Sequence, residues 1–259
     1  MKVTEAAFVQ GFIRMCDDGF KQNWHERNGG NLSYRIKPEE VDEVKEELCF
    51  DKPWQPIGTS VPGLAGEYFL VTGSGKYFRN VILDPAANIC IIRVDDKGEE
   101  FQICWGLVNG GRPTSELPSH LMNHEVKKQL TDGRHRVIYH AHPTNTIALT
   151  FVLPLEDKVF TRELWEMATE CPVVFPDGIG VVGWMVPGGR DIAVATSELM
   201  KKYDVVALGE LLIDFTENGT SAQGNPLLEA NPGGAPCNVL AMLEKLGKKT
   251  AFIGKVGKD

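Results

Sequence analysis

Amphipathic segments with a helical spacing of apolar residues and short apolar runs occur in turn along the chain, and together they predict an α/β protein. Over residues 5–20, apolar side chains recur every three or four positions, which predicts an amphipathic helix. Runs rich in β-branched and aromatic residues predict strands at residues 32–36, 68–71, 89–94, 101–107, 136–140 and 172–175. The polar turn at residues 95–99 joins two of these runs, so they predict a hairpin and a sheet that is at least partly antiparallel.

Helical segments are predicted between the strands as far as residue 202. They are a helix opened by residues 113–118 and running to about residue 130, then 144–152, 162–169 and 191–202. The acidic segment 38–48 predicts a solvated surface helix or loop. After residue 202 the pattern begins again, with a strand at 204–210, a helix at 239–246 and a strand at 250–256. The 57 residues beyond position 202 are few for an independent hydrophobic core.

Composition and charge narrow the classes of partner. The net charge of -8 argues against nucleic acid or an anionic membrane as a main partner. The six cysteines contain no CxxC pair and are typical of free thiols in a reducing compartment. The sequence has no signal peptide and no apolar run long enough to span a bilayer, so we expect a cytoplasmic protein.

Two histidines at the end of the predicted strand 136–140 are the first candidates for chemistry. His140 and His142 are two positions apart, so in a strand both imidazoles point to the same face. Neutral imidazole is a strong ligand for Zn²⁺, and the pair therefore predicts half of a metal site. The alternative is two ordinary histidines on a polar strand face. His120 and His124 lie one helical turn apart and could also pair on a metal, but we expect ordinary helix residues there, because nothing else converges on them.

Glycine-rich turns are candidates for phosphate binding. Residues 72–76, Thr-Gly-Ser-Gly-Lys, follow a predicted strand, and such a turn lets backbone N–H groups and hydroxyls approach a phosphate. It lacks the spacing of a nucleotide-binding P-loop, and a simple tight turn is the alternative. Residues 28–31 form a second loop of this kind. Residues 178–183 match GxGxxG, but Pro187 prevents the following helix that a dinucleotide site needs.

Glu116 is the candidate acid–base group. It lies at the start of a predicted helix between Pro113 and Pro118. Next to a divalent metal, such a carboxylate can abstract a proton bound to carbon. The alternative is a solvated glutamate that interacts favourably with the helix dipole.

Six stretches of the first 202 residues resemble the rhamnulose-1-phosphate aldolase family of the class II aldolase/adducin superfamily. They are ERNGGN at 26–31, FLVTGSGK at 69–76, DPAAN at 84–88, PTSELP at 113–118, HAH at 140–142 and TECPVVFPDG at 169–178. The resemblance implies a three-layer α/β sandwich with a central, mainly antiparallel sheet and helices on both faces. It also implies a homotetrameric, zinc-dependent lyase of carbohydrate catabolism. Such a lyase reversibly cleaves a phosphorylated ketose, L-rhamnulose 1-phosphate, to dihydroxyacetone phosphate and L-lactaldehyde.

The resemblance also implies roles for single residues. Members of this family hold Zn²⁺ with three histidines, and His140 and His142 match two of them. Glu116 matches the catalytic glutamate, and Glu170 matches a glutamate that acts from a neighbouring subunit. The residues that match substrate and phosphate contacts are Asn28, Gly30, Asn31, Thr72, Gly73, Ser74, Gly75, Thr114 and Ser115. Zinc in such a site would chelate the ketone and a neighbouring hydroxyl oxygen and stabilise the enediolate.

The chain departs from this family after residue 202. The family's third histidine lies beyond that point, and no histidine follows His142 here. Residues 203–259 instead resemble the N-terminal part of ribokinase-like sugar kinases, of the fructokinase kind. Residues matching sugar contacts in that family are Asp214, Gly233, Gly234 and Asn238. The kinase's later catalytic aspartate and nucleotide site have no counterpart here, so we expect no phosphoryl transfer.

Two domains are therefore expected: 1–202, class II aldolase-like without its usual C-terminal part, and 203–259, a truncated ribokinase-like segment of partial α/β structure. Two alternatives to a working lyase stay open: a non-catalytic adducin-like scaffold, and a sugar-binding kinase fragment.

Overall fold

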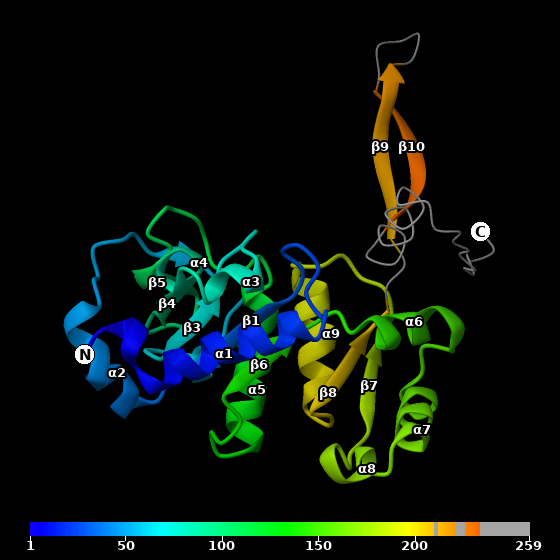
Figure 1. The fold of residues 1–259 in the computed structure, drawn as a ribbon, viewed down its shortest axis with the longest axis horizontal. Coiled ribbons are helices and arrows are strands. Elements are labelled where there is room, and N and C mark those ends of the chain that lie inside the picture. Colours follow the sequence, from blue (N-terminus) through cyan, green and yellow to red (C-terminus); the bar gives the residue numbers. More distant parts are fainter. Residues whose placement is uncertain (210–211, 221–225, 234–259) are drawn as a thin grey trace. The chain divides into compact units, whose positions relative to one another are not determined.

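The chain forms two compact units in the structure, a computed structural model that describes residues 1–209, 212–220 and 226–233. The first unit contains residues 1–143 and 185–206. The second contains residues 144–184 and the described residues from 207 on. Figure 1 shows the elements coloured along the sequence.

A six-stranded antiparallel sheet is the centre of the first unit. Its order is β2-β5-β4-β3-β1-β6, and every neighbouring pair is antiparallel. The strands are β1 (Asn31–Arg35), β2 (Gln55–Pro56), β3 (Tyr68–Thr72), β4 (Ile89–Val94), β5 (Glu100–Gly106) and β6 (Val137–His140). The mainly antiparallel sheet and the β4–β5 hairpin are confirmed, whereas the two-residue strand β2 is too short to leave a periodic pattern.

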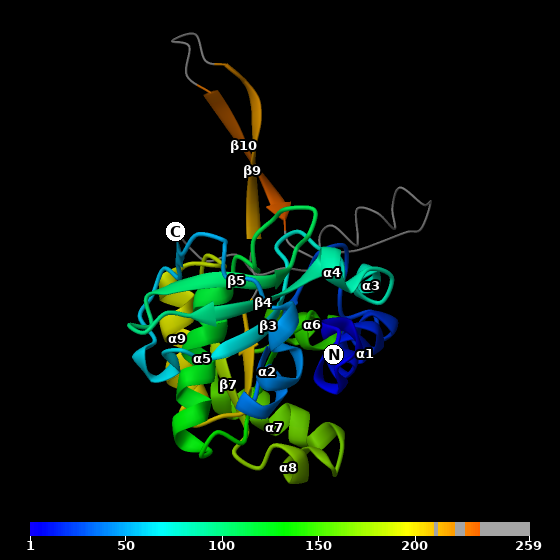
Figure 2. The ribbon, with the colours of Figure 1, turned by 90° about the vertical axis from the view of Figure 1, so that its left-hand side faces the viewer.

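Helices cover both faces of this sheet. Alternate residues of a strand point to opposite faces, so Leu70 joins one hydrophobic cluster while Phe69 and Val71 join another. Helix α1 (Ala7–Lys21) packs into the first cluster, and α5 (Leu117–Leu130) packs into the second. Helix α9 (Arg190–Met200) lies beside α5. Figure 2 shows the strands between α1 on one side and α5 with α9 on the other, which confirms the three-layer sandwich.

Short helices complete the first unit. They are η1 (Val3–Glu5), α2 (Pro38–Val44), η2 (Lys45–Glu47), η3 (Pro62–Leu64), α3 (Phe78–Val81) and α4 (Pro85–Asn88). The acidic segment 38–48 is therefore helical along most of its length.

The second unit has a small core of its own around Phe160, Ile179 and Ala207. Its helices are α6 (Thr144–Val152), α7 (Asp157–Met167) and α8 (Cys171–Val174). Strand β7 (Ile179–Val182) forms a two-stranded sheet with β8 (Val205–Leu208), whose last two residues belong to this unit. Strands β9 (Leu212–Thr220) and β10 (Pro226–Gly233) form an antiparallel pair.

The strand predicted at residues 172–175 is wrong, because this segment forms the short helix α8. Pro172 occupies the first turn, where its fixed φ and missing N–H favour a helix. Val173 and Val174 are 81% and 74% exposed. Their high strand propensity stabilises a strand only where the side chains pack against a sheet face, and here they do not.

The predicted helix at 239–246 and strand at 250–256 lie outside the described residues. Among the residues that are described, no helix is both long and apolar enough to cross a membrane.

Candidate active site

His140 and His142 lie side by side where β6 ends. Their ring centroids are 4.9 Å apart, and their side chains are 23% and 15% exposed. Pairing of β6 with β1 places His140 opposite Asn31, and the His142 N–H donates to the Trp24 carbonyl at 2.8 Å. The structure thus brings the two imidazoles predicted from the strand pattern to one place.

Each of these histidines faces a carboxylate. Nδ1 of His142 lies 2.6 Å from Oε1 of Glu26, and Nδ1 of His140 lies 2.9 Å from Oε2 of Glu116. A carboxylate on one ring nitrogen fixes the orientation of an imidazole, as it does for many metal-binding histidines. Sequence reasoning missed Glu26, although it opens the ERNGGN loop and was available as a nearby acidic residue.

Glu116 is held as a carboxylate. It immediately precedes α5, and its side chain is 21% exposed. Burial alone would raise the pKa of Glu116, but the adjacent His140, helped by His120 and Asn31, outweighs burial and lowers the pKa to about 2. The group is therefore ionised at neutral pH and able to accept a proton.

The histidine pair suits a divalent metal in donor type but does not make a complete set. His140 Nδ1 is buried and makes no well-aligned hydrogen bond to any described residue, despite its distance from Glu116. Because Nδ1 of His140 lies next to the Glu116 carboxylate, Nε2 is the ring nitrogen that would reach a metal. However, no three His, Cys, Asp or Glu side chains in the described part of the chain converge to hold a metal ion. We therefore derive no chemical step through a metal.

The loop at residues 28–31 is fixed by a buried histidine. His25 Nδ1–H donates to the Gly29 carbonyl at 3.0 Å, and its Nε2 accepts the Tyr139 hydroxyl proton at 2.6 Å. Burial lowers the pKa of His25 to about 4. Gly30 has φ +75°, and a Cβ there would lie 2.6 Å from the His140 carbonyl oxygen. Only glycine fits this turn, which brings residues 28–31 against the histidine pair.

The second predicted loop, residues 72–75, lies against the segment 113–115. The Gly73 N–H donates to Asn88 O at 2.9 Å, and the Ser74 N–H donates to Arg112 O at 2.8 Å. The Thr114 N–H donates to Thr72 O at 2.9 Å. These three N–H groups are committed to the fold and are not available to a ligand.

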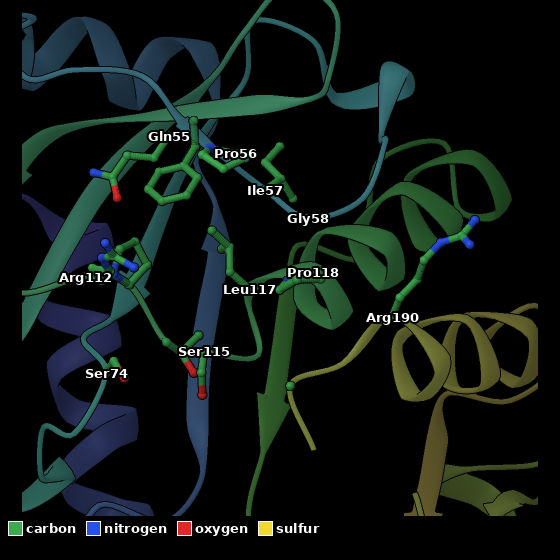
Figure 3. Close-up of a pocket in the computed structure, with 14 residues that line it drawn as sticks. Gln55, Pro56, Ile57, Gly58, Ser74, Arg112, Ser115, Leu117, Pro118 and Arg190 are labelled. Atoms are coloured by element: carbon green, nitrogen blue, oxygen red, sulfur yellow. The ribbon is translucent and has the colours of Figure 1, made fainter. Parts of the chain in front are cut away.

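A pocket with a volume of about 610 Å³ is lined by the hydroxyl-bearing residues Ser74, Thr114 and Ser115. Its lining also includes Arg112 and Arg190, which sequence reasoning missed. In the view of Figure 3, Ser74, Arg112 and Ser115 lie on one side of the pocket and Arg190 lies on the other. Hydroxyls and guanidinium groups are the usual partners of a phosphate.

The remaining candidates lie elsewhere. His120 and His124 are buried on α5 and bind Ser33 rather than meeting the histidine pair. Glu170 is exposed in the second unit, at the start of α8. Asp214 lies in β9 and Gly233 lies in β10. Gly234 and Asn238 fall outside the described residues.

Comparison with known protein families gives two matches along the chain. The family described as Class II Aldolase and Adducin N-terminal domain matches residues 10–210. The pfkB family carbohydrate kinase matches residues 202–259.

Curated relatives match the same region. The chain is 52% identical over 199 residues to a rhamnulose-1-phosphate aldolase of Mannheimia succiniciproducens, covering 77% of this chain and 73% of that protein. It is 48% identical over 204 residues to the rhamnulose-1-phosphate aldolase of Escherichia coli, covering 79% and 74%. Among solved structures, a sugar-phosphate aldolase from Thermotoga maritima is 23% identical, with a TM-score of 0.63. That likeness covers 93% of this chain and 96% of the other and supports the fold.

Proposed function

The chain belongs to the class II aldolase and adducin family, and from that premise we propose that it is a lyase for L-rhamnulose 1-phosphate. The reaction is the reversible cleavage of this ketose phosphate to dihydroxyacetone phosphate and L-lactaldehyde. Relatives about half identical in sequence carry the name of this activity. The observation that carries the proposal is the ionised Glu116 beside the His140/His142 pair.

Glu116 moves the proton in this mechanism. In the direction of cleavage, the Glu116 carboxylate accepts the proton of the hydroxyl group whose carbon becomes the aldehyde, and the carbon–carbon bond breaks to leave an enediolate. The protonated Glu116 then gives that proton to the enediolate carbon. In the direction of synthesis, the Glu116 carboxylate removes the same proton. A carboxylate whose pKa lies well below 7 is present in its basic form whenever dihydroxyacetone phosphate binds.

Phosphate binding positions the reacting carbon. We assign it to the loops that contain Asn28, Gly30, Asn31 and Thr72–Gly75, and to the hydroxyls of Thr114 and Ser115. Ser115 lines the pocket and is joined directly to Glu116, so a phosphate held there lies near the base. Binding energy at the remote phosphate then fixes the substrate for the chemistry.

Class II aldolases are generally metal-dependent enzymes, and we propose that Zn²⁺ is the metal, with His140 and His142 as two ligands. No histidine follows His142 in the sequence, and no third donor from the described residues joins the pair. We therefore expect weaker zinc binding than at a three-histidine site.

Three further expectations belong to this proposal. Residues 1–202 form the aldolase-like domain and residues 203–259 a ribokinase-like segment. The active form is a homotetramer, in which the exposed Glu170 reaches the site of a neighbouring subunit. The protein works in the cytoplasm, which agrees with five free thiols among the described cysteines.

Zinc content and lyase activity test the proposal together. The full chain is dialysed exhaustively, its zinc is measured by elemental analysis, and release of dihydroxyacetone phosphate is followed with and without added zinc. We expect activity that rises with zinc and is lost in both His140→Ala and Glu116→Ala. A parent without activity at saturating zinc contradicts the proposal, and so does a Glu116→Ala variant as active as the parent.

A non-catalytic, adducin-like scaffold is the second candidate. The incomplete set of metal donors among the described residues favours it. A folded protein that binds no zinc and cleaves no substrate supports this reading. A third candidate, sugar binding by the kinase-like segment, rests on the match to residues 202–259. It predicts sugar-dependent thermal stabilisation that disappears when this segment is removed.

A further inference from the structure

Two buried histidines have no part in the proposed reaction. His120 and His124 lie one turn apart on α5 and are 2% and 0% exposed. The Ser33 hydroxyl on β1 lies between them, 2.5 Å from Nδ1 of His120 and 2.8 Å from Nε2 of His124. On its other side, His120 places Nε2 against Oδ1 of Asn31. Asn31 in turn lies opposite His140, whose ring is 2.9 Å from Glu116, and the Asn31 side chain helps to lower the pKa of that carboxyl group. His124, Ser33, His120 and Asn31 therefore form one continuous chain of polar contacts, and it ends near Glu116.

The chemistry of each group fixes the direction of these hydrogen bonds. The Asn31 oxygen can only accept, so the His120 Nε2 carries hydrogen and donates to it. A neutral imidazole has one N–H, so His120 Nδ1 must accept, and the Ser33 hydroxyl donates to it. That uses the only Ser33 proton, so Ser33 accepts from His124 Nε2–H. Burial keeps both rings neutral, lowering the pKa of His120 to about 4 and that of His124 well below its usual value.

If every hydrogen bond between His124 and Asn31 ran in the opposite direction, the arrangement would be unfavourable at both ends of the chain of contacts. It would turn the Asn31 amide so that its oxygen faced the Glu116 carboxylate, and two acceptors would then repel each other. It would also put a hydrogen on His124 Nδ1, a buried atom with no hydrogen-bond partner among the described residues. A bare nitrogen lone pair is tolerated there more easily than an unsatisfied N–H donor.

We propose that Ser33, His120 and His124 form a directional hydrogen-bond chain that turns the Asn31 NH₂ group towards Glu116 and thereby positions this carboxylate. His120 and His124 are positioning residues, because they act on the reaction only through Asn31. The chain has a defined tautomer at each ring, with hydrogen on Nε2 of both histidines. Its link to catalysis rests on the proposed function, whereas the direction of its hydrogen bonds does not.

Histidine tautomers can be measured in the full chain without any activity. Two-bond ¹H–¹⁵N correlation spectra of ¹⁵N-histidine-labelled protein at pH 7 distinguish Nε2–H from Nδ1–H, and single replacements assign the signals. We expect Nε2–H for His120 and His124. His25 is the internal control, because its donation to Gly29 requires the opposite tautomer, Nδ1–H. An Nδ1–H tautomer, or averaging between tautomers, at His120 or His124 overturns the proposal.

Matched substitutions test the link to Glu116. His120→Gln keeps an amide N–H that can donate to Asn31, whereas His120→Leu keeps the bulk and no donor. We expect His120→Leu to lower kcat at least about tenfold, with a smaller change in KM, and His120→Gln to recover most of the loss. Equal kcat for the parent and His120→Leu overturns the positioning role.

Ser33→Ala covers the case in which His120→Leu does not fold. It removes a single hydroxyl from the middle of the chain, and we expect a mixture of tautomers at His120 together with a fall in kcat of about threefold. An unchanged His120 tautomer and unchanged kcat in Ser33→Ala count against the proposal. A parent without lyase activity defeats the proposed function, while the tautomer spectra still decide the direction of the hydrogen-bond chain.

Discussion

Glu116 is the residue on which the proposed chemistry depends most directly. Replacing it with Gln keeps the shape and removes the basic oxygen, so we expect kcat to fall at least about a hundredfold. The free energy of unfolding should change far less, because the side chain is partly exposed. Steady-state release of dihydroxyacetone phosphate and a urea titration measure the two effects. Glu46→Gln, at an exposed position on η2, is the matched control and should leave both unchanged.

Three buried histidines predict a distinctive loss of stability in acid. Burial lowers the pKa of His25 and His120 to about 4, and lowers that of His124 well below its ordinary value. Between pH 6.5 and 4 the unfolded chain therefore binds more protons than the folded chain, so the free energy of unfolding falls as the pH falls through this window. Each histidine contributes a slope of up to about 1.4 kcal/mol per pH unit.

His120→Gln removes one of these titrating groups. We expect denaturant titrations from pH 7 to pH 4 to give a shallower pH dependence for this variant, by about one proton. If the free energy of unfolding of the parent and of His120→Gln depends on pH equally, His120 takes up its proton at the same pH in the folded and the unfolded chain, and the prediction is wrong.

The candidate site shows what single residues reveal in the sequence and what they do not. His140 and His142 are two positions apart on one strand, so a local rule was enough to place them together. Glu26 and Ser33 reach the site through contacts across 116 and about 90 positions of chain. Such contacts depend on strand register and helix packing, which no local pattern encodes.

At the scale of elements, Gly106 shows how strongly a single turn controls the sheet. It ends β5 with φ +84°, and a Cβ there would lie 2.2 Å from the backbone oxygen of Ile89. Backbone cannot move aside as a side chain can, so we expect Gly106→Ala to lower the free energy of unfolding by about 2 kcal/mol or more. Gly110→Ala is the matched control, since φ is +81° and no atom lies within 4 Å of its Cβ.

We therefore expect Gly110→Ala to lower the free energy of unfolding by about 1 kcal/mol, through backbone strain alone. Thermal unfolding of the two variants gives the comparison. If both variants lose the same free energy of unfolding, the backbone near Ile89 has shifted to make room for the new methyl group, and the prediction for Gly106→Ala is wrong.

Helices and strands were predicted correctly from the sequence where their apolar side chains pack against another element. Strands β3, β4 and β5 are buried on both faces, between two hydrophobic clusters, and the sequence shows them as apolar runs rich in β-branched and aromatic residues. Residues 172–175 have equally high strand propensity, but Val173 and Val174 lie exposed in a helix. Propensity predicts a strand only when a neighbouring strand and a covered face are present.

At the scale of the whole molecule, the change of family resemblance near residue 202 and the packing of the chain follow different boundaries. Lys127 on α5 has a side chain only 8% exposed, and its ammonium group donates to Tyr203 O at 2.8 Å and lies 2.5 Å from Asp204 Oδ1. Ala207 belongs to the core of the second unit. Residues 203–209 thus continue the packing of the preceding chain, although they lie where the kinase resemblance begins.

This packing predicts the outcome of two truncations. A chain ending at residue 202 loses both partners of a buried ammonium group and also loses β8, whereas a chain ending at residue 209 keeps them. We expect the shorter chain to be less stable by at least about 2 kcal/mol, measured by urea unfolding. Lys127→Met removes the charge that is left without partners, so it should narrow the difference between the two truncations. If both truncations are equally stable, residues 203–209 contribute nothing to the preceding fold; if Lys127→Met leaves the gap unchanged, the loss comes from β8 alone.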